Sequence, residues 1–580
     1  MYSRIFLKSS LWFSALICLA AGAYVALTST QQFFYAFNYL LGPVGDGATD
    51  TARVIFPVIT GDQPWTKLLE PFADHRIFIE RLIIIYDFVF HHGIEEAHPL
   101  RMAAVFWAIL ILFSAVVFAN KKLPLVSKCL LSGCGGVLVF ARVSLTNFDM
   151  PITFTWPMVL LFALFSFITT ERYCAAIEKR STLTAKFYLI LTALFVLLNL
   201  YTFNIGLILW PVIFIVLLKR RVFFANATLW ASLAVLMYAF YFWSGWHPGI
   251  TATDGGMKHS LFNPIHPFLY FSRIVSIPMV STAIITASLA TILIGISIIC
   301  LSLYCLSRFW RLYRWSASET IVFASLLFSF LTLLIIPVMR AWIEAEYVVV
   351  GLRFTAISFF LYLSLLASLF IFRYQVPRKH TTLTDSLLAI MIAVWLVGLF
   401  IPSDTYLYRP SRYNPYFIAL STGIPINPAL AHYFDFSDSA VNLQNLAFND
   451  AIQKKYHHGA YFLWPTQEMN QHFREVHAAV APCEFAMTHE IRADLRAKGS
   501  AMLVVETQLS LAKSPSQWSL LFTNQQNKLI GYSLPLLVKR GQSQTWQGAV
   551  NTMLLHGRYV NAWLFNREKN QICAGGKIKV

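Results

Sequence analysis

The chain contains few charged residues. Of its 580 residues only 13% are Asp, Glu, Lys or Arg, whereas 57% are hydrophobic. A water-soluble domain carries about a quarter charged residues, so this composition excludes an ordinary soluble protein. The apolar residues gather in runs of about 20, the length of helix that crosses a bilayer. The sequence therefore predicts a mainly α-helical protein that spans a membrane several times.

Several signatures of common protein classes are missing from the sequence. It has no Walker loop, no Rossmann glycine motif and no Cys/His cluster with zinc spacing. It also lacks the internal repeat that many transporters show. The formal charge of +17 could indicate nucleic-acid binding. However, most of the excess lies in short loops between apolar runs, where basic residues fix membrane topology, so we expect no nucleic-acid partner.

Hydropathy and loop charge together predict about eleven spans. They lie near residues 11–27, 102–119, 124–141, 152–170, 187–203, 205–218, 223–243, 277–305, 319–338, 355–372 and 387–401. Basic residues concentrate in alternate connections, at 121–122, 172–186, 219–221, 308–314 and 373–379. The positive-inside rule places these connections in the cytoplasm together with the N-terminus. An odd number of spans then places the tail on the outer side.

Two domains follow from this pattern, residues 1–401 in the membrane and residues 402–580 outside it. The tail is long enough for one domain, and its pattern predicts strands at 500–507 and 528–534 and a helix at 446–456. We therefore expect a C-terminal α/β extracytoplasmic domain. The single glycosylation sequon, Asn226-Ala227-Thr228, falls on the predicted cytoplasmic side. A long exterior without one fits a bacterial inner membrane.

Cysteine is scarce, with eight in the whole chain. Six lie in or beside the predicted spans, and Cys483 and Cys573 lie in the tail. An exported domain that has two cysteines often pairs them in an oxidising compartment. We therefore predict a Cys483–Cys573 disulfide, and the alternative is a pair of free, buried thiols.

The connection between the first two spans, residues 29–100, is long and polar. It holds Asp46 and Asp50, and further on the run Asp74-His75-Arg76 and then Arg81. Acids, a histidine and arginines at a membrane surface suggest chemistry on an anionic, lipid-linked substrate. The plainer interpretation is a solvated loop with turns and salt bridges.

Sugar transfer from a polyprenyl phosphate requires two kinds of group. A cation must stabilise the charge on the leaving phosphate, and a carboxylate must accept the proton of the acceptor or hold a metal. All the candidates lie on the outer side in the predicted topology. The acids are Asp46, Asp50 and Asp74, and the cations are Arg76, Arg81, Arg340 and Arg353.

These residues resemble motifs of the bacterial GT-C glycosyltransferase superfamily. The segment from Asp74 to Asp87 is similar to the His-Arg-Ile signature of a poorly characterised membrane family in that neighbourhood. Thr146-Asn147-Phe148-Asp149 is similar to its second exterior loop. Arg340, Gly351 and Arg353-Phe354 resemble an Arg…Gly…Ser-Arg-Tyr pattern, in which Leu352 and Phe354 here replace the serine and the tyrosine. The resemblance covers roughly residues 1–400.

The resemblance implies a glycosyltransferase that moves a sugar from a polyprenyl-phosphate donor to a glycan, lipid or protein at the periplasmic face. Asp46, Asp50, Asp74 and His75 would be catalytic, and the first two would hold a divalent cation, Mg²⁺ or Mn²⁺, if one is used. Arg76, Arg81, Arg340 and Arg353 would bind the donor phosphate. Asn147 and Asp149 would contact the acceptor or have a structural role.

Three other functions remain open on the sequence. A polysaccharide polymerase or ligase acting on an undecaprenyl-diphosphate glycan would use the same arginines without a metal. A transporter or flippase would usually place ionisable residues within its spans. A non-catalytic envelope assembly protein would act through the tail.

Overall fold

The structure is a computed structural model of the whole chain. It describes residues 2–37, 54–71, 76–90, 94–140, 154–221, 224–243, 262–279, 289–344, 354–375, 481–482, 487–491, 502–509, 518–535, 544–551, 559–566 and 571–579. The predicted span at 387–401 and the predicted helix at 446–456 lie outside these residues.

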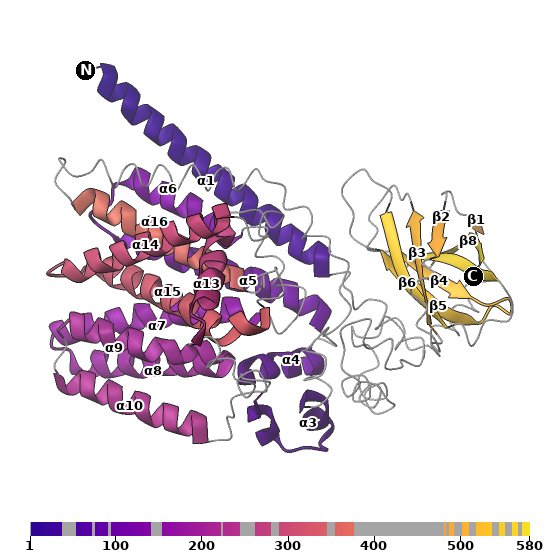
Figure 1. Cartoon of the computed structure of the whole chain (residues 1–580), viewed down its shortest axis with the longest axis horizontal. Coiled ribbons are helices and arrows are strands. Elements are labelled where there is room, and N and C mark those ends of the chain that lie inside the picture. The colour runs from indigo at the N-terminus through magenta and orange to yellow at the C-terminus, as the bar shows by residue number, and fades with distance from the viewer. Residues whose placement is uncertain are drawn as a thin grey trace.

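The described part of residues 1–375 is helical (Figure 1). Its helices are α1 (Tyr2–Phe37), α3 (Phe56–Thr60), η2 (Trp65–Leu69), α4 (Phe78–Phe90), α5 (Ile94–Ala119), α6 (Leu125–Val139), α7 (Thr155–Glu178), α8 (Thr182–Thr202), η5 (Asn204–Ile208), α9 (Leu209–Lys219), α10 (Phe224–Trp243), α13 (Ile265–Ser276), η6 (Ile277–Met279), α14 (Leu289–Arg311), α15 (Ala317–Glu344) and α16 (Thr355–Gln375). Segments of the predicted polar connection 29–100 are therefore helical, including α3, η2 and α4.

Seven described helices are long and apolar enough to cross a membrane. They are Trp12–Thr30, Leu100–Ala119, Thr155–Glu178, Thr182–Thr202, Leu289–Arg311, Ala317–Val338 and Thr355–Gln375. Two shorter apolar helices, Leu125–Val139 and Asn204–Lys219, match two further predicted spans. The chain therefore has the helices of a multi-span membrane protein, and the count of eleven stays a prediction.

The predicted span near residues 277–305 is described in part. Its first residues form the 3-10 helix η6 (Ile277–Met279), which contains Pro278, and its later residues belong to α14 (Leu289–Arg311). Proline restricts the backbone and removes a hydrogen-bond donor. Residues 280–288 lie outside the described residues, so the start of this span stays a prediction.

Helix α16 lies at the centre of the helical part. Every residue from Thr355 to Phe372 is buried, and α16 packs against α6, α7, α13, α14 and α15. By contrast α1 exposes most of its span and extends away from the other helices at its N-terminus (Figure 1). In a bilayer, α1 would accordingly be a peripheral helix with its apolar side chains in lipid.

Glycines let α1 approach α6 closely. A Cβ added at Gly133 would lie 2.4 Å from the backbone oxygen of Cys18, and one added at Gly22 would lie 2.3 Å from that of Gly133. The Ser29 hydroxyl donates to the carbonyl of Phe140 at 2.9 Å further along the same pair. Small residues at such a crossing are how membrane helices gain close packing, so this seam attaches α1 to the remaining helices.

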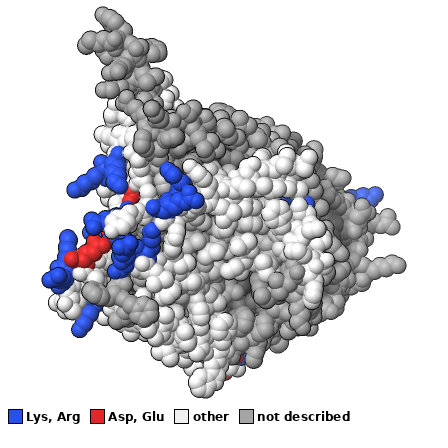
Figure 2. All heavy atoms as spheres, turned by 60° about the vertical axis from the view of Figure 1, so that its left-hand side comes forward, with Lys and Arg blue, Asp and Glu red and all other residues white. Residues whose placement is uncertain are grey.

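Basic residues of the predicted cytoplasmic connections gather at one end of the helices. Figure 2 shows this group of Lys and Arg side chains with a few acids among them. Buried Glu319 joins three helix ends there: it accepts from Lys122 Nζ at 3.0 Å and from the Ser316 backbone N–H at 2.6 Å, and it also accepts from Gln375. These connections therefore lie at a common end, as alternate loops of a membrane protein must.

The tail contains an eight-stranded sheet in the order β1-β8-β7-β4-β5-β6-β3-β2. Its strands are β1 (Ala481–Pro482), β2 (Met487–Ile491), β3 (Met502–Leu509), β4 (Trp518–Thr523), β5 (Leu529–Pro535), β6 (Gln544–Asn551), β7 (Tyr559–Asn566) and β8 (Gln571–Lys579). Neighbours are antiparallel except β1 and β8. The strands predicted at 500–507 and 528–534 are confirmed as β3 and β5.

The predicted disulfide is not tested by the register of the sheet. Ala481, two residues before Cys483, is opposite Cys573, and Pro482 is opposite Ala574. Cys573 is not one of the free cysteines of the described residues, and the six outside the tail are all free. Cys483 itself lies outside the described residues, so the Cys483–Cys573 pairing stays a prediction.

Candidate functional site

Only part of the predicted site falls in the described residues. Those outside them are Asp46, Asp50, Asp74, His75, Asn147, Asp149 and Arg353. The structure describes Arg76 and Arg81 with their side chains, and it places the backbone of Arg340 in α15. The described part of the candidate site therefore consists of these two arginines and the helix ends beside the other candidates.

Arg76 joins the segment before α4 to nearby η2 and to the distant helix α10. Its side chain is buried, with 1% of the residue exposed. Nη1 donates to the carbonyl of Leu69 at 2.9 Å, and Nη2 donates to the carbonyl of Tyr241 at 3.2 Å. The guanidinium also lies 5.1 Å from the centre of the Tyr241 ring, within cation–π range. Arg76 thus fixes the chain against η2 and α10.

Arg81 has a related role one turn further on. It is fully buried in α4, and its Nη1 donates to the carbonyls of Leu68 at 2.6 Å and Glu70 at 2.5 Å. These carbonyls belong to the end of η2, where a short helix leaves acceptors without partners in the helix. A guanidinium, which carries several donors in a planar fork, can satisfy them together.

Neither arginine is an exposed side chain of a solvated loop, which is the plainer interpretation of the sequence. Each is buried and donates to backbone carbonyls in the connection that the sequence predicts as a polar loop. The physical reason is local: η2 and the turn after it present carbonyl groups that need donors, and Arg76 and Arg81 supply them.

The described residues 65–71 and 76–90 form the arginine-anchored segment, which lies at the end of the helices opposite the basic residues. Phe78 contacts the ring of Tyr201 near the end of α8, and Tyr201 contacts Tyr241 near the end of α10, both with centroids 6.3 Å apart. The other ends of α8 and α10 follow the basic connections. A helix of about 20 residues is about 30 Å long, so the two ends are about a bilayer apart (Figure 1).

Other candidates belong to this same end of the helices. Phe354, which directly follows Arg353, is buried with its ring edge-on to Trp156 at 5.1 Å. Trp156 lies near the start of α7, far from the basic end where α7 finishes. Glu319, in the first turn of α15, lies at the basic end. Arg340 is near the last residue of α15 and therefore lies toward the opposite end of the helices. The chain thus brings Arg76, Arg340 and the neighbour of Arg353 to one end.

Phe354 also explains one departure from the resembled pattern. That pattern has a tyrosine where this chain has phenylalanine. Here the ring fills an aromatic cluster with Trp156 and Phe203, whose centroids are 4.6 Å apart. A buried position lined by rings requires no hydroxyl, so Phe354 serves packing at the start of α16.

No protein-family model, curated protein or solved structure matches the chain. The resemblance to the GT-C superfamily therefore stays a prediction that depends on the motifs alone. Among the described residues no group of three or more His, Cys, Asp and Glu side chains could hold a metal ion. The predicted metal ligands, Asp46 and Asp50, lie outside those residues, so metal use also stays a prediction.

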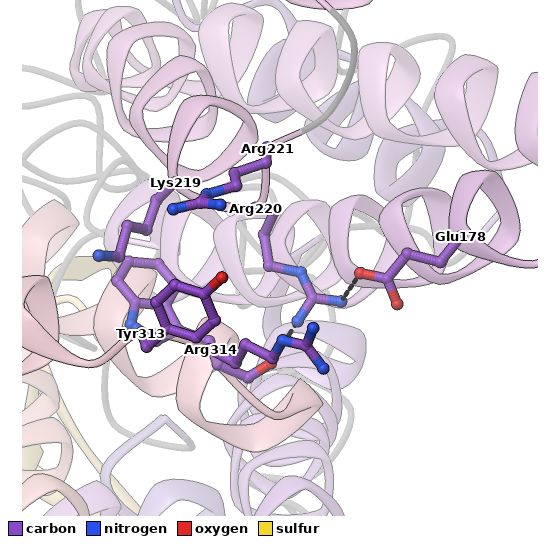
Figure 3. A pocket seen from close by; sticks show the side chains of 7 residues that line it. Glu178, Lys219, Arg220, Arg221, Tyr313 and Arg314 are labelled. Atoms are coloured by element: carbon purple, nitrogen blue, oxygen red, sulfur yellow. Dashed lines mark hydrogen bonds and ion pairs between the residues drawn. The ribbon is translucent and has the colours of Figure 1, made fainter.

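The sequence did not predict a pocket at the basic end. The structure has a cavity of about 430 Å³ there, lined by Lys219, Arg220, Arg221 and Arg314 together with one carboxylate, Glu178 (Figure 3). The pattern of basic connections indicated membrane topology for these residues. It could not show that separate connections come together around a cavity, because that depends on how α7, α9 and α14 pack.

Proposed function

We propose that the chain is a membrane glycosyltransferase of GT-C type. It would transfer a sugar from a polyprenyl-phosphate donor to a glycan, lipid or protein acceptor at the periplasmic face of a bacterial inner membrane. The observation that carries the proposal is the buried attachment of Arg76 to η2 and α10. It fixes the backbone immediately beside Asp74 and His75, and a positioned backbone is what catalytic groups need.

In this proposal Arg76 and Arg81 are positioning residues. Their hydrogen bonds to the carbonyls of Leu69, Tyr241 and the end of η2 hold the segment that precedes and forms α4. The donor phosphate would instead be bound mainly by Arg340 and Arg353. Arg340 and Phe354, the residue after Arg353, belong to the same end of the helices. Guanidinium groups suit this task because they bind phosphate oxygens through two parallel hydrogen bonds.

The chemical step breaks the bond between the sugar C1 and the phosphate oxygen and forms a bond from C1 to the acceptor oxygen. The electron pair of the broken bond stays on the phosphate, whose added charge the arginines stabilise. The acceptor proton passes to a carboxylate, for which Asp46 and Asp50 are the candidates. His75 would orient that carboxylate or the acceptor. A divalent cation, if used, would be held by the same two aspartates.

The test is sugar transfer in proteoliposomes that contain polyprenyl-phosphate sugars. Asp46→Asn or Asp50→Asn should lower turnover by about 10²–10⁴-fold, the usual effect of losing a positioned acid or base. Arg353→Ala should weaken use of the donor, and Arg353→Lys should restore it only in part. The matched control is Asp62→Asn, which removes an exposed carboxylate from the same connection.

Full activity in Asp46→Asn, Asp50→Asn and Arg353→Ala would refute the proposed roles. An equal loss in Asp62→Asn would show that charge in this connection matters in general and that no particular aspartate is catalytic. Thermal unfolding of each variant in detergent should stay close to that of the unchanged chain. That measurement separates a lost catalytic group from a lost fold.

A further inference from the structure

The pocket at the basic end holds more positive charge than its own carboxylate neutralises. It lies where α7 and α9 end and where the chain continues beyond α14 (Figure 3). Four cationic side chains line it against one carboxylate. Such an excess around a cavity favours an anion, because opposite charge within a few ångströms is attractive even near solvent.

Two of the four cations already have partners within the protein. Arg220 donates to Glu178 Oε1 at 2.9 Å and to the carbonyl of Trp315. Lys219 donates to the carbonyl of Trp310 and lies 5.1 Å from the centre of its ring. These two residues are therefore structural: they bind the end of α9 to the turn that follows α14.

The other two cations, Arg221 and Arg314, face the same aromatic ring. Their guanidinium carbons lie 5.1 Å and 5.8 Å from the centre of Tyr313. Neither forms an ion pair with any described residue. Two like charges gathered around one ring repel each other, and an anion bound between them would relieve that repulsion. The pair has the planar donors that bind phosphate oxygens two at a time.

The pocket lies at the level where the apolar helices end. Lys219 is the last residue of the apolar helix Asn204–Lys219. Tyr313 and Arg314, which line the pocket, follow shortly after the apolar helix α14 ends at Arg311. Trp310 and Tyr313 are 51% and 71% exposed there. Exposed Trp and Tyr beside Lys and Arg are typical of the membrane interface, which is the depth of lipid phosphate groups.

We propose that this pocket binds the phosphate of an anionic membrane lipid, with Arg221 and Arg314 as the groups that contact it. The acyl chains would lie along the apolar helices, and the headgroup would lie beside Tyr313. Glu178 holds Arg220 and so leaves the other two guanidinium groups as the net positive charge. The proposal concerns the end of the molecule opposite the candidate catalytic site and does not depend on the function proposed there.

The chain offers matched variants for a test. Arg221 and Arg180 both end a helix in the left-handed conformation, with φ of 51° and 54°, and glycine is the usual residue in that position. Arg221→Gly and Arg180→Gly therefore relieve the same backbone strain and remove the same charge at the same end. Only Arg221 lines the pocket. Arg314→Gln and Arg308→Gln form a second matched pair, because each removes one arginine charge at the basic end and only Arg314 lines the pocket.

The experiment is a titration of the purified full chain in neutral detergent, with lipid adducts counted by native mass spectrometry. Phosphatidylglycerol is compared with phosphatidylcholine of the same acyl chains. The unchanged protein should prefer phosphatidylglycerol. Arg221→Gly and Arg314→Gln should each weaken its binding by about tenfold, the effect of losing one charged hydrogen-bonding group. Arg180→Gly and Arg308→Gln should leave it unchanged.

Three results would overturn the proposal. One is an equal loss in Arg180→Gly, which would mean that only the overall charge of this end matters. Another is unchanged binding in both pocket variants, with thermal unfolding showing that they are folded. The third is displacement of the lipid by inorganic phosphate at the same concentration, which would identify the occupant as a soluble anion.

Discussion

Arg81 shows how one buried side chain can maintain a whole segment. Its guanidinium supplies donors to two carbonyls at the end of η2, and no solvent reaches it. Arg81→Met would keep much of the side-chain volume but leave those acceptors without a donor. An unsatisfied buried polar group costs about 1–3 kcal/mol, so we expect the free energy of unfolding to fall by about that amount or more. Thermal or denaturant unfolding in detergent measures this.

The comparison for Arg81 lies in the same short unit. Lys67 forms an ion pair with Glu70 at 2.5 Å, and both side chains are partly exposed. Exposed ion pairs contribute about 0–1 kcal/mol. Lys67→Met should therefore change stability little. If Lys67→Met and Arg81→Met lowered stability equally, the carbonyl contacts of Arg81 would not be the cause.

Glu319 has a comparable role at the basic end. The sequence Ser316-Ala317-Ser318-Glu319 forms a capping box at the start of α15: Glu319 Oε2 accepts from the Ser316 N–H, and the Ser316 hydroxyl accepts from the Glu319 N–H at 3.4 Å. Glu319→Ala removes the cap and the contacts to Lys122 and Gln375. We expect it to destabilise the fold by about 2 kcal/mol.

A second variant separates the charge of Glu319 from its hydrogen bonds. Glu319→Gln keeps an acceptor oxygen for the Ser316 N–H but loses the ion pair with Lys122. Because the Lys122 side chain is 55% exposed, water can solvate it once the pair is lost. Glu319→Gln should therefore cost less than Glu319→Ala in the same unfolding measurement. A larger cost would mean that the ion pair, and not the cap, dominates.

At the scale of elements, the crossing of α1 and α6 depends on glycine. A Cβ at Gly133 would lie 2.4 Å from the backbone oxygen of Cys18, so Gly133→Ala forces one helix to move. Gly135 is nearly adjacent on the same helix, but a Cβ there would meet only the flexible ends of Leu110 and Leu363 at 3.1 Å and 3.4 Å. Overpacking that must shift a helix backbone costs about 1–3 kcal/mol.

The two glycines therefore make a matched pair of variants. Gly133→Ala should lower the thermal unfolding temperature and loosen α1, which faster proteolysis within α1 would detect. Gly135→Ala should be close to neutral, since side chains can adjust and alanine favours the helix. Equal effects of the two substitutions would contradict a backbone-limited crossing.

The sequence predicts the helices better than it predicts their ends or their contacts. Apolar runs identify α7, α8, α15 and α16, because lipid demands apolar side chains along the whole of a span. The same signal covers α14 but extends over Ile277–Met279, which form the 3-10 helix η6. Hydropathy also cannot detect helical turns that extend beyond an apolar run. Helix α5 therefore begins at Ile94, although the apolar run begins near residue 102.

The candidate site was less predictable, for a physical reason. Arg76 and Arg81 bind backbone carbonyls, and a carbonyl leaves no mark in the sequence because every residue has one. Two arginines in a polar connection therefore look the same whether they are exposed or buried. The pocket around Arg221 and Arg314 is similar, since its two arginines come from connections about 90 residues apart whose meeting depends on tertiary packing.

At the scale of the whole molecule, the chain has two chemically different ends. One carries the basic connections and the lipid pocket proposed here, and the other carries the arginine-anchored segment with the start of α16. The positive-inside rule predicts that the basic end faces the cytoplasm and that the tail is outside.

Two exposed positions test this orientation. Gln525 lies in the tight loop between β4 and β5, where Asn527 takes a left-handed conformation and Asn524 accepts from the backbone N–H groups of Gln526 and Lys528. Lys179 follows the last residue of α7 at the basic end and is exposed. A cysteine at either position should be reachable without disturbing a buried contact, because neither side chain is buried in the described structure.

In spheroplasts, a membrane-impermeant maleimide should label Gln525→Cys at once and Lys179→Cys only after the membrane is disrupted. The unchanged chain gives the background, which includes the exposed native Cys300 of α14. Labelling of Lys179→Cys from outside, with Gln525→Cys protected, would reverse the orientation. It would also move the candidate catalytic end to the cytoplasm and so contradict transfer at the periplasmic face, which makes this measurement a test of the proposed function as well as of the topology.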